Sequence, residues 1–242
     1  MKIIGVIPAR MAASRLPGKP LLDIAGKPMV QWVWERASKA QSLSEIYIAT
    51  PDAEIIEAAE RFGAKAMITS HNHRSGTDRT AEVARRTDGD AYVNVQGDEP
   101  MLDPDNIDAL VAPMQQDSSV QMASVYCIED PSEYNSPAVV SVVMAQNGDA
   151  LYFSRSRIPY PRETTELPVY KHLGLYAYQR ETLLKLAELP PTPLERTESL
   201  EQLRALEHGI PIRMSPVKTG SIAVDTEDDL HRARELMAGL LF

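Results

Sequence analysis

An α/β fold with a mixed, mostly parallel sheet is predicted by three features of the sequence. The first is the nearly continuous apolar run from Ile3 to Ile7, which is typical of a strand buried on both faces. The second is a strict alternation of strand-like and helix-like segments in the first part of the chain. The third is the shortness of the connections, which favours right-handed crossovers between parallel strands.

The alternation predicts the elements in order. Strands are expected at residues 2–8, 46–50, 64–68 and 91–95, and helices at 29–40, 53–62, 78–86 and 105–115. The strand-like segments at 120–126, 139–144, 150–153 and 173–178 then indicate antiparallel edge strands. A helix capped by Thr192 is expected to run to about His208 and, after a strand at 212–217, Thr226 is expected to cap a last helix.

Length and composition predict one compact domain, 1–242, and the strand-rich segments of its second half indicate a small lobe inserted around residues 135–168. A chain of 242 residues can bury a substantial core, and it contains no internal repeat or low-complexity linker. The formal charge of -9 argues against binding to a nucleic-acid backbone, because such binding normally needs a basic face.

Cellular location is predicted from the cysteine count and the apolar segments. Cys127 is the only cysteine, so no intrachain disulfide is possible, which fits a reducing compartment. No signal-peptide pattern opens the chain, and no apolar window approaches a membrane-spanning length. We therefore expect a cytoplasmic protein that does not bind a membrane.

Positive charge gathers directly after the first expected strand. Arg10, Arg15 and Lys19 supply the charge, and Gly18 permits a close approach of the backbone. In an open α/β sheet ligands bind at the carboxyl ends of the strands, so this loop is suited to hold a polyphosphate. It matches neither a Walker A loop nor a G-x-G-x-x-G fingerprint, and charge alone is also consistent with a solvated basic loop.

Two carboxylates stand at strand ends that face the same edge. Asp98 follows the strand expected at residues 91–95, and Asp225 precedes the last expected helix. Mg²⁺ needs only one or two protein carboxylates beside substrate oxygens and water, so this pair could hold that ion. Each residue alone is equally consistent with a local cap or turn acceptor.

Eight sequence blocks in order resemble the CMP-Kdo synthetases, the 3-deoxy-manno-octulosonate cytidylyltransferases. The blocks are Pro8-Ala-Arg10, Ser14-Arg-Leu-Pro-Gly-Lys19, Asp23-Ile-Ala-Gly-Lys27, Ser75-Gly-Thr-Asp-Arg79, Val93-Asn-Val-Gln-Gly-Asp98, Ala150-Leu-Tyr-Phe-Ser-Arg155, Lys171-His-Leu-Gly-Leu-Tyr176 and Leu200-Glu-Gln-Leu-Arg204. The resemblance runs from Ile3 to Leu230 and implies a Rossmann-like nucleotidyltransferase core with a dimerisation lobe, hence a homodimer.

The resemblance also implies a reaction and a site. The anomeric hydroxyl of Kdo would attack the α-phosphate of CTP with Mg²⁺ as cofactor, giving pyrophosphate and CMP-Kdo for lipopolysaccharide biosynthesis. Its implied catalytic residues are Arg10, Arg15, Lys19, Asp98 and Asp225, the last two as metal ligands. The implied nucleotide-binding residues are Pro8, Ala9, Arg10, Ser14, Lys19, Ser75, Gly76 and Asp98, and the implied sugar-acid residues are Gln96, Arg155, His172, Tyr176, Glu198 and Gln202. This chemistry needs cations and alignment rather than a covalent nucleophile, and Arg155 could grip a carboxylate bidentately.

Two departures from the family pattern leave the sugar open. Ser141 stands where a lysine is common, and Lys171 where many members have arginine. The same reaction on 8-amino-Kdo or another ulosonic acid is therefore an alternative, although either change is also consistent with neutral drift on a surface strand. A non-catalytic nucleotide-sensing subunit would be expected to lack Lys19, Asp98 or Asp225, and all are present. His172 without the family pattern would be interpreted as a buried core histidine, and His71 and His73 as loop residues.

Overall fold

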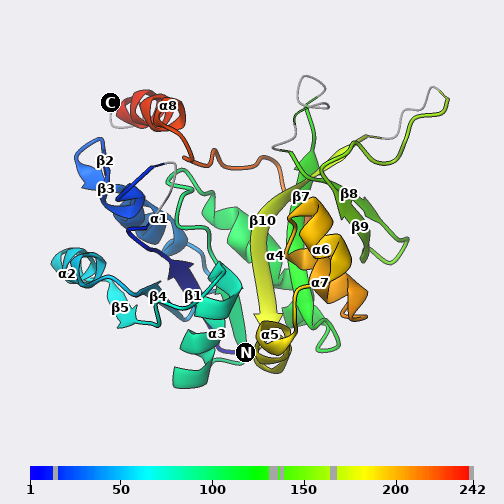
Figure 1. Ribbon diagram of the computed structural model, residues 1–242, viewed down its shortest axis with the longest axis horizontal. Coiled ribbons are helices and arrows are strands. Elements are labelled where there is room, and N and C mark those ends of the chain that lie inside the picture. Colours follow the sequence, from blue (N-terminus) through cyan, green and yellow to red (C-terminus); the bar gives the residue numbers. More distant parts are fainter. Residues whose placement is uncertain (13–15, 131–135, 137–138, 164–167, 240–242) are drawn as a thin grey trace. The chain divides into compact units, whose positions relative to one another are not determined.

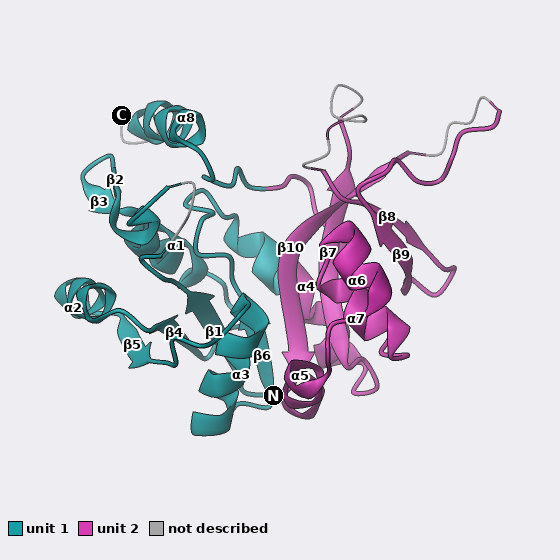
Figure 2. Ribbon diagram, viewed as in Figure 1, with its two compact units in different colours: residues 1–108, 221–242 teal, residues 109–220 magenta. Residues whose placement is uncertain are grey.

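The computed structural model describes residues 1–12, 16–130, 136, 139–163 and 168–239, which fall into two compact units (Figure 2). Unit 1 comprises residues 1–108 and 221–242, and unit 2 comprises residues 109–220. The lobe expected at 135–168 falls in unit 2, but its residues 135, 137–138 and 164–167 lie outside the described part. No helix in the described ranges is long and apolar enough to cross a membrane.

Unit 1 is built on a parallel sheet of four strands in the order β6, β1, β4, β5 (Figure 1). These strands are β1 (Ile3–Pro8), β4 (Glu45–Thr50), β5 (Lys65–Ile68) and β6 (Ala91–Asn94). In register, Val6 lies opposite Tyr47 of β4 and Asn94 of β6. The apolar side chains of β1 are fully buried, as the sequence predicts for a central parallel strand.

Helices α1 (Met29–Ala37), α2 (Ala53–Arg61) and α3 (Gly76–Arg86) connect these strands and pack against the sheet. Unit 1 also contains helix α8 (Glu227–Ala238) and a short 3₁₀ turn η1 at Lys19–Leu21. Helix α4 (Pro104–Gln116) begins in unit 1 and ends in unit 2. The expected alternation of strands and helices is confirmed, with boundaries that differ by a few residues.

A small second core holds the C-terminal helix in unit 1. Leu230, Ala233 and Met237 of α8 are buried against apolar side chains that include Ile24 and Trp32. Ile24 belongs to the hairpin of β2 (Asp23–Ile24) and β3 (Lys27–Pro28), and its carbonyl accepts a hydrogen bond from Trp32 Nε1 at 2.6 Å. This packing holds the end of the chain against the hairpin and α1, and it includes Val224, which fixes the segment that carries Asp225.

Unit 2 contains a mixed sheet. Its strands are β7 (Met122–Ile128), β8 (Ser141–Met144), β9 (Ala150–Ser154), β10 (Tyr170–Gln179) and β11 (Arg213–Pro216). Strand β7 pairs antiparallel with β10 and parallel with β11, while β8 pairs antiparallel with β10 and with β9. The expected change to antiparallel pairing after the parallel half is confirmed.

The helices of unit 2 differ from the sequence prediction in two ways. The prediction omits α5 (Arg180–Glu188), and the single helix expected from Thr192 to His208 is wrong. Two helices, α6 (Pro193–Glu198) and α7 (Gln202–Glu207), are separated at Ser199, which has a left-handed φ of 52°. The Arg155 guanidinium donates to the carbonyls of Glu198 and Ser199, at 2.8 and 3.3 Å, and so holds the chain in this break.

Candidate functional site

A cavity of about 330 Å³ opens in unit 1 at the carboxyl ends of β1 and β6. It is lined by Pro8, Ala9, Arg10, Ala12, Leu16, Lys19, Pro20, His73, Arg74, Ser75, Gly76, Arg79, Gln96, Gly97, Asp98 and Asp225. All the residues that the sequence assigns to the nucleotide and to the metal line this cavity, apart from Ser14 and Arg15. Those two residues lie outside the described ranges, so their assignment stays a prediction.

Parallel strands explain why these residues meet. Because β1 and β6 run side by side in the same direction, the loops that follow them leave the same edge of the sheet. Gly97 lets the loops approach closely, since a Cβ at this position would lie 2.5 Å from the carbonyl oxygen of Pro8. A side chain on residue 97 would therefore push the two loops apart.

The loop after β1 is anchored at both of its described ends. The backbone N–H of Met11 donates to Asp52 Oδ2 at 2.7 Å, and the N–H of Gly18 donates to the carbonyl of Met11 at 3.1 Å. Gly18 has a left-handed φ of 69°, which glycine adopts without strain. These contacts hold Arg10 and Lys19 at the cavity before any ligand binds, which lowers the entropy cost of binding.

Lys19 joins the two carboxylates that the sequence pairs. Its Nζ lies 2.8 Å from Asp98 Oδ2 and 2.9 Å from Asp225 Oδ1. The three side chains are 15%, 27% and 40% exposed, respectively, so Lys19 is not the solvated cation that a merely basic loop would present. We call this arrangement of Lys19, Asp98 and Asp225 the Lys19 bridge.

The donor set at the Lys19 bridge fits a magnesium ion. Two carboxylate oxygens converge on one point, and Mg²⁺ is commonly held by one or two carboxylates together with substrate phosphates and water. Within the described ranges no group of three or more His, Cys, Asp or Glu residues could hold a metal. A cation here would therefore take part of its coordination from a ligand such as a phosphate chain.

Sequence reasoning missed Glu99, which lies beside Asp98. Ser221 donates a hydrogen bond to its carboxylate. Burial raises the pKa of Glu99 to about 7, the Ser221 hydrogen bond opposes this rise and the charge of Asp98 adds to it. The only signal in the sequence was the second carboxylate of the Asp-Glu pair, which does not distinguish a buried acid from an exposed one.

The loop before α3 forms another wall of the cavity. Ser75 caps the helix by accepting a hydrogen bond from the N–H of Asp78 at 3.2 Å, so α3 begins at Gly76 rather than at the expected Asp78. The sequence analysis missed this cap because Ser75 is followed by a glycine instead of an apolar residue. Both Ser75 and Gly76 thereby reach the cavity.

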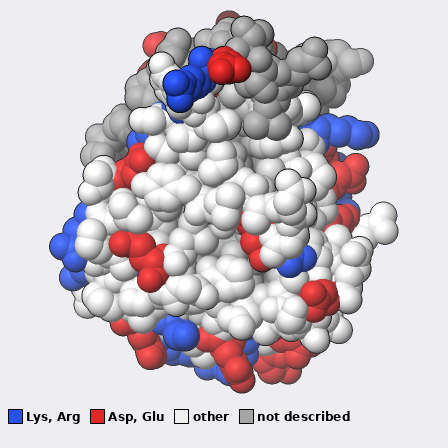
Figure 3. All heavy atoms as spheres, turned by 90° about the vertical axis from the view of Figure 1, so that its right-hand side faces the viewer, with Lys and Arg blue, Asp and Glu red and all other residues white. Residues whose placement is uncertain are grey.

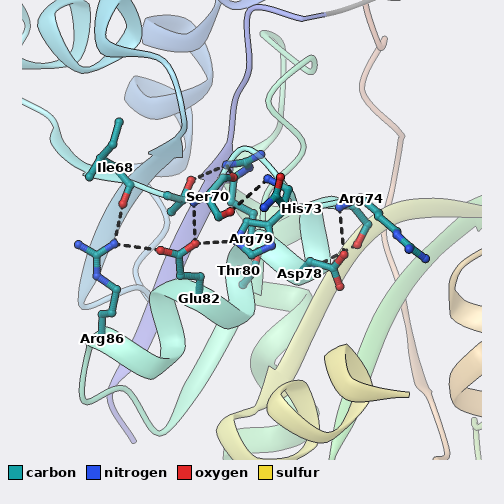
Figure 4. Close-up of polar contacts among 12 residues, drawn as sticks. Ile68, Ser70, His73, Arg74, Asp78, Arg79, Thr80, Glu82 and Arg86 are labelled. Atoms are coloured by element: carbon teal, nitrogen blue, oxygen red, sulfur yellow. Dashed lines mark hydrogen bonds and ion pairs between the residues drawn. The ribbon is translucent and has the colours of Figure 1, made fainter. Parts of the chain in front are cut away.

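Buried polar contacts fix this loop in place (Figure 4). Arg79 is 3% exposed and donates to Thr69 Oγ1 and to the carbonyl of Ser70. Burial, reinforced by the charge of Arg10, lowers the pKa of Arg79. The sequence analysis did not single out Arg79, although it lines the cavity and brings a second guanidinium near Arg10.

Glu82 of α3 also binds the loop that precedes this helix (Figure 4). Its carboxylate accepts hydrogen bonds from the N–H of Ser70 and from Arg86, and lies 2.6 Å from His73 Nε2. Burial opposes ionisation of Glu82, but these hydrogen bonds outweigh it and lower its pKa. His73 is thus held by Glu82 as a loop residue, as the sequence analysis expects.

Five of the residues that the sequence assigns to a sugar acid lie in unit 2, and Gln96 lies in unit 1. Glu198 accepts hydrogen bonds from Ser154 Oγ at 2.7 Å and from the N–H of Arg155 at 3.0 Å. The guanidinium of Arg155 donates to backbone carbonyls at the break between α6 and α7. The structure therefore brings Arg155 and Glu198 together.

His172 and Tyr176 lie next to each other on β10. Their ring centroids are 5.4 Å apart, and His172 also contacts Phe153 edge-on. The Nε2 of His172 lies 2.9 Å from Ser124 Oγ, whose single proton goes to the carbonyl of Leu175 at 2.8 Å. His172 therefore donates from Nε2. Burial lowers the pKa of His172 to about 3, so its ring is neutral at pH 7. Burial also raises the pKa of Tyr176.

Gln202 opens α7 with its side chain inside unit 2. The residue is 5% exposed, and its Nε2 has no hydrogen-bond partner among the described residues. A buried amide donor without a partner is uncommon in folded proteins, so such a group is suited to bind a ligand acceptor.

A parallel sheet whose strand ends hold cations and two carboxylates around one cavity defines a nucleotidyltransferase-type protein. A family model described as Cytidylyltransferase matches residues 4–214. The 3-deoxy-manno-octulosonate cytidylyltransferase of Myxococcus xanthus is 51% identical over 98% of this chain and 96% of its own, and that of Geobacter metallireducens is 48% identical over 98% of both. The chain belongs to the 3-deoxy-manno-octulosonate cytidylyltransferases.

A solved structure supports the fold. The structure of CMP:2-keto-3-deoxy-manno-octonic acid synthetase complexed with CTP superposes with a TM-score of 0.96 at 44% identity. The match covers 99% of this chain and 100% of that one. The Rossmann-like nucleotidyltransferase fold expected from the sequence is confirmed.

Proposed function

We propose that this protein transfers a cytidylyl group from CTP to Kdo, forming CMP-Kdo and pyrophosphate for lipopolysaccharide biosynthesis. Its membership of the 3-deoxy-manno-octulosonate cytidylyltransferases supports this proposal. The structural observation that carries it is the cavity of unit 1, where Arg10 and Lys19 stand beside two carboxylates. Nucleotidyl transfer requires alignment of phosphates and neutralisation of negative charge, and these groups supply both.

The nucleotide would occupy the cavity of unit 1. Arg10 and Lys19, with Arg15 of the same loop, would bind the triphosphate, and Pro8 and Ala9 would approach it through the backbone. Ser75 and Gly76 would lie beside the nucleoside, because both line the wall made by the start of α3. The N-terminus of that helix also favours negative charge.

Asp98 and Asp225 would hold Mg²⁺. When bound, the ion would supply positive charge that offsets the negative charge of the leaving pyrophosphate. The hydrogen bond from the N–H of Val224 to the carbonyl of Asp98, at 2.9 Å, supports the pairing, because it fixes the backbones that carry both carboxylates.

The sugar acid would be bound by Gln96, Arg155, His172, Tyr176, Glu198 and Gln202. The buried Nε2 of Gln202 supports a donor role toward a sugar oxygen. The neutral state of His172 favours a positioning role over neutralisation of a carboxylate. Glu198 holds Arg155 at the break between α6 and α7, where the guanidinium would approach the carboxylate of the acid.

The identity of the acid is the open part of the proposal, and 8-amino-Kdo or another ulosonic acid is the alternative. Ser141 is buried, so it does not lie on an exposed surface as the sequence analysis expects. It lies opposite Lys171 in the pairing of β8 with β10 and opposite Ser154 in the pairing with β9. Ser154 in turn donates to Glu198, so Ser141 is two contacts away from the proposed sugar residues.

Pyrophosphate release by the purified protein tests the reaction. CTP and UTP would each be offered with Mg²⁺ and with Kdo, 8-amino-Kdo or N-acetylneuraminate. Release with CTP and Kdo alone is the expected result. Preference for another acid would keep the chemistry and change the substrate, whereas no release with any pair would contradict the proposed function.

A homodimer formed through unit 2 is also proposed. Uncharged side chains cover most of the face on the side of β8 and β9 (Figure 3). The large apolar side chains of Ile128, Leu151, Tyr160 and Leu194 are exposed in this unit, and exposed apolar patches often mark interfaces. Light scattering should give the mass of a dimer and, for Leu151→Glu, that of a monomer. Leu236→Glu, which changes an exposed leucine of unit 1, is the matched control.

The cytoplasm is the proposed location. Cys127 is buried and is the only cysteine of the sequence, so no intrachain disulfide can form, which fits a reducing compartment. Fractionation of cells that express the tagged protein would test this location.

A further inference from the structure

The Lys19 bridge places one ammonium between the two carboxylates proposed to hold a metal. Nζ of Lys19 is within hydrogen-bond distance of Asp98 Oδ2 and of Asp225 Oδ1, at 2.8 and 2.9 Å. We propose that Lys19 excludes a divalent cation from the ligand-free site and gives way only when a nucleotide offers its phosphates. This inference rests on the proposed function, because it takes Asp98 and Asp225 as the cation ligands.

Competition for the same oxygens is the physical basis of this inference. An ammonium and a divalent cation cannot both lie between Oδ2 of Asp98 and Oδ1 of Asp225, since Mg²⁺ requires oxygens at about 2.1 Å. The side chain of Lys19 is only 15% exposed, so water screens its attraction to the carboxylates weakly. A free cation would therefore have to displace a bound positive charge and would also be repelled by it.

A nucleotide changes this balance through its phosphate oxygens. Lys19 lines the same cavity as Arg10, so phosphates bound there would offer the ammonium new acceptors close to its position. As the ammonium turns toward them, the two carboxylates would become available to the cation that the phosphates carry. Metal and nucleotide would then bind together, and the ligand-free protein would remain closed to free metal.

Hydrogen bonds around the bridge keep the carboxylates in place during such an exchange. The N–H of Val224 donates to the carbonyl of Asp98 at 2.9 Å, and the N–H of Asp225 donates to Asp229 Oδ2 at 3.1 Å. Neither hydrogen bond includes the side chain of Lys19. The site that remains when the lysine is removed should keep its two ligands in position.

Binding of Mn²⁺ to the protein without nucleotide, followed by electron paramagnetic resonance, tests the proposal. The proteins compared are the wild type, Lys19→Met, Asp98→Asn and the double variant Lys19→Met with Asp98→Asn. Lys65→Met is the matched control, because it removes a lysine that pairs with Glu45 elsewhere in unit 1. Lys19→Met should bind one Mn²⁺ on the order of tenfold more tightly than the wild type and than Lys65→Met. The double variant should lose this gain.

Each result supports or overturns the proposal. Equal Mn²⁺ affinity in the wild type and Lys19→Met would overturn the proposal that Lys19 excludes the cation. If Asp98→Asn bound Mn²⁺ more weakly in that case, the metal site itself would still be supported. A gain that persists in the double variant, or no binding by any protein, would overturn both the exclusion and the metal site. If Lys19→Met does not fold, Lys19→Gln replaces it, because the amide can still donate to a carboxylate. Mg²⁺ should raise the Tm of Lys19→Met, or of Lys19→Gln where that variant replaces it, more than the Tm of the wild type.

Discussion

Val224 donates its backbone N–H to the carbonyl oxygen of Asp98 at 2.9 Å. This one contact joins the segment after β6 to the segment before α8, which are far apart in the sequence. Asp98 and the neighbour of Val224, Asp225, consequently meet at the Nζ of Lys19. The loop after β1, the segment after β6 and the segment before α8 therefore meet at one lysine.

Asp98→Asn should lower kcat by a factor on the order of 10²–10³ while leaving the fold intact, since a neutral amide neutralises Mg²⁺ poorly. Steady-state pyrophosphate release and a thermal unfolding curve would measure the two effects. Asp228→Asn, which removes an exposed carboxylate of α8, is the control for the change in charge. A rate close to that of the wild type would contradict the assignment of Asp98 as a metal ligand.

Gly97→Ala should destabilise the protein by about 1–3 kcal/mol, because its Cβ would lie 2.5 Å from a backbone oxygen of Pro8. Activity should also fall, since the loops that carry Arg10 and Asp98 would be pushed apart. Chemical denaturation and pyrophosphate release would be compared with those of Gly239→Ala, where a Cβ meets only ordinary contacts. Unchanged stability in Gly97→Ala would show that the two loops can separate without cost.

Glu99→Gln should change how stability depends on pH. The pKa of Glu99 is about 7 in the folded protein and about 4.5 when unfolded, so the wild type should lose stability as pH rises from 4.5 to 7. The glutamine side chain of the variant cannot ionise, so the variant should be more stable than the wild type at pH 8, by about 3 kcal/mol. Urea unfolding at pH 5 and pH 8 would measure this, and equal differences at both pH values would argue against a raised pKa.

Much of unit 1 was predictable because its signals are local. The apolar run of β1, the glycine after α2 and the threonine that caps α8 each report on a few neighbouring residues. The shared edge of β1 and β6 then follows from topology, which is why the sequence could place Asp98 beside the loop after β1. The position of Arg10 and Lys19 at this edge was predictable for the same reason, because both follow β1 closely in the sequence. Asp225 reaches this edge through the segment before α8, where Val224 bonds to Asp98.

Features that depend on tertiary contacts were not predictable. The helix expected after Thr192 is broken at Ser199, whose φ of 52° is left-handed, and Arg155 from another part of the chain hydrogen-bonds to the carbonyls there. The burial of Glu99 depends on packing that includes Ser221, and that of Ser141 on strands on both of its sides. No spacing of residue types contains this information.

Ser75→Ala should lower the free energy of unfolding by about 1 kcal/mol, because the N-cap of α3 is lost, and should raise KM for CTP. Ser75→Asp should keep the cap and restore stability, but its negative charge at the cavity should keep KM high. Denaturation curves and CTP saturation curves would separate the two effects. A normal KM in Ser75→Asp would show that this position does not face the nucleotide.

His172→Gln should remove an acid-sensitive part of the stability. Burial lowers the pKa of His172 to about 3, whereas an unfolded histidine has a pKa near 6.5. The unfolded chain therefore takes up a proton first as pH falls, and the wild type should lose on the order of 3 kcal/mol between pH 7 and pH 4 through this residue.

The glutamine amide can still donate to Ser124 but cannot take up a proton, so the variant should lose less stability over the same pH range. Urea unfolding at pH 7 and pH 4 would give the difference, with His208→Gln as the control because that residue is exposed. If wild type and His172→Gln lost equal stability on acidification, His172 would not be the buried neutral base that its contacts indicate.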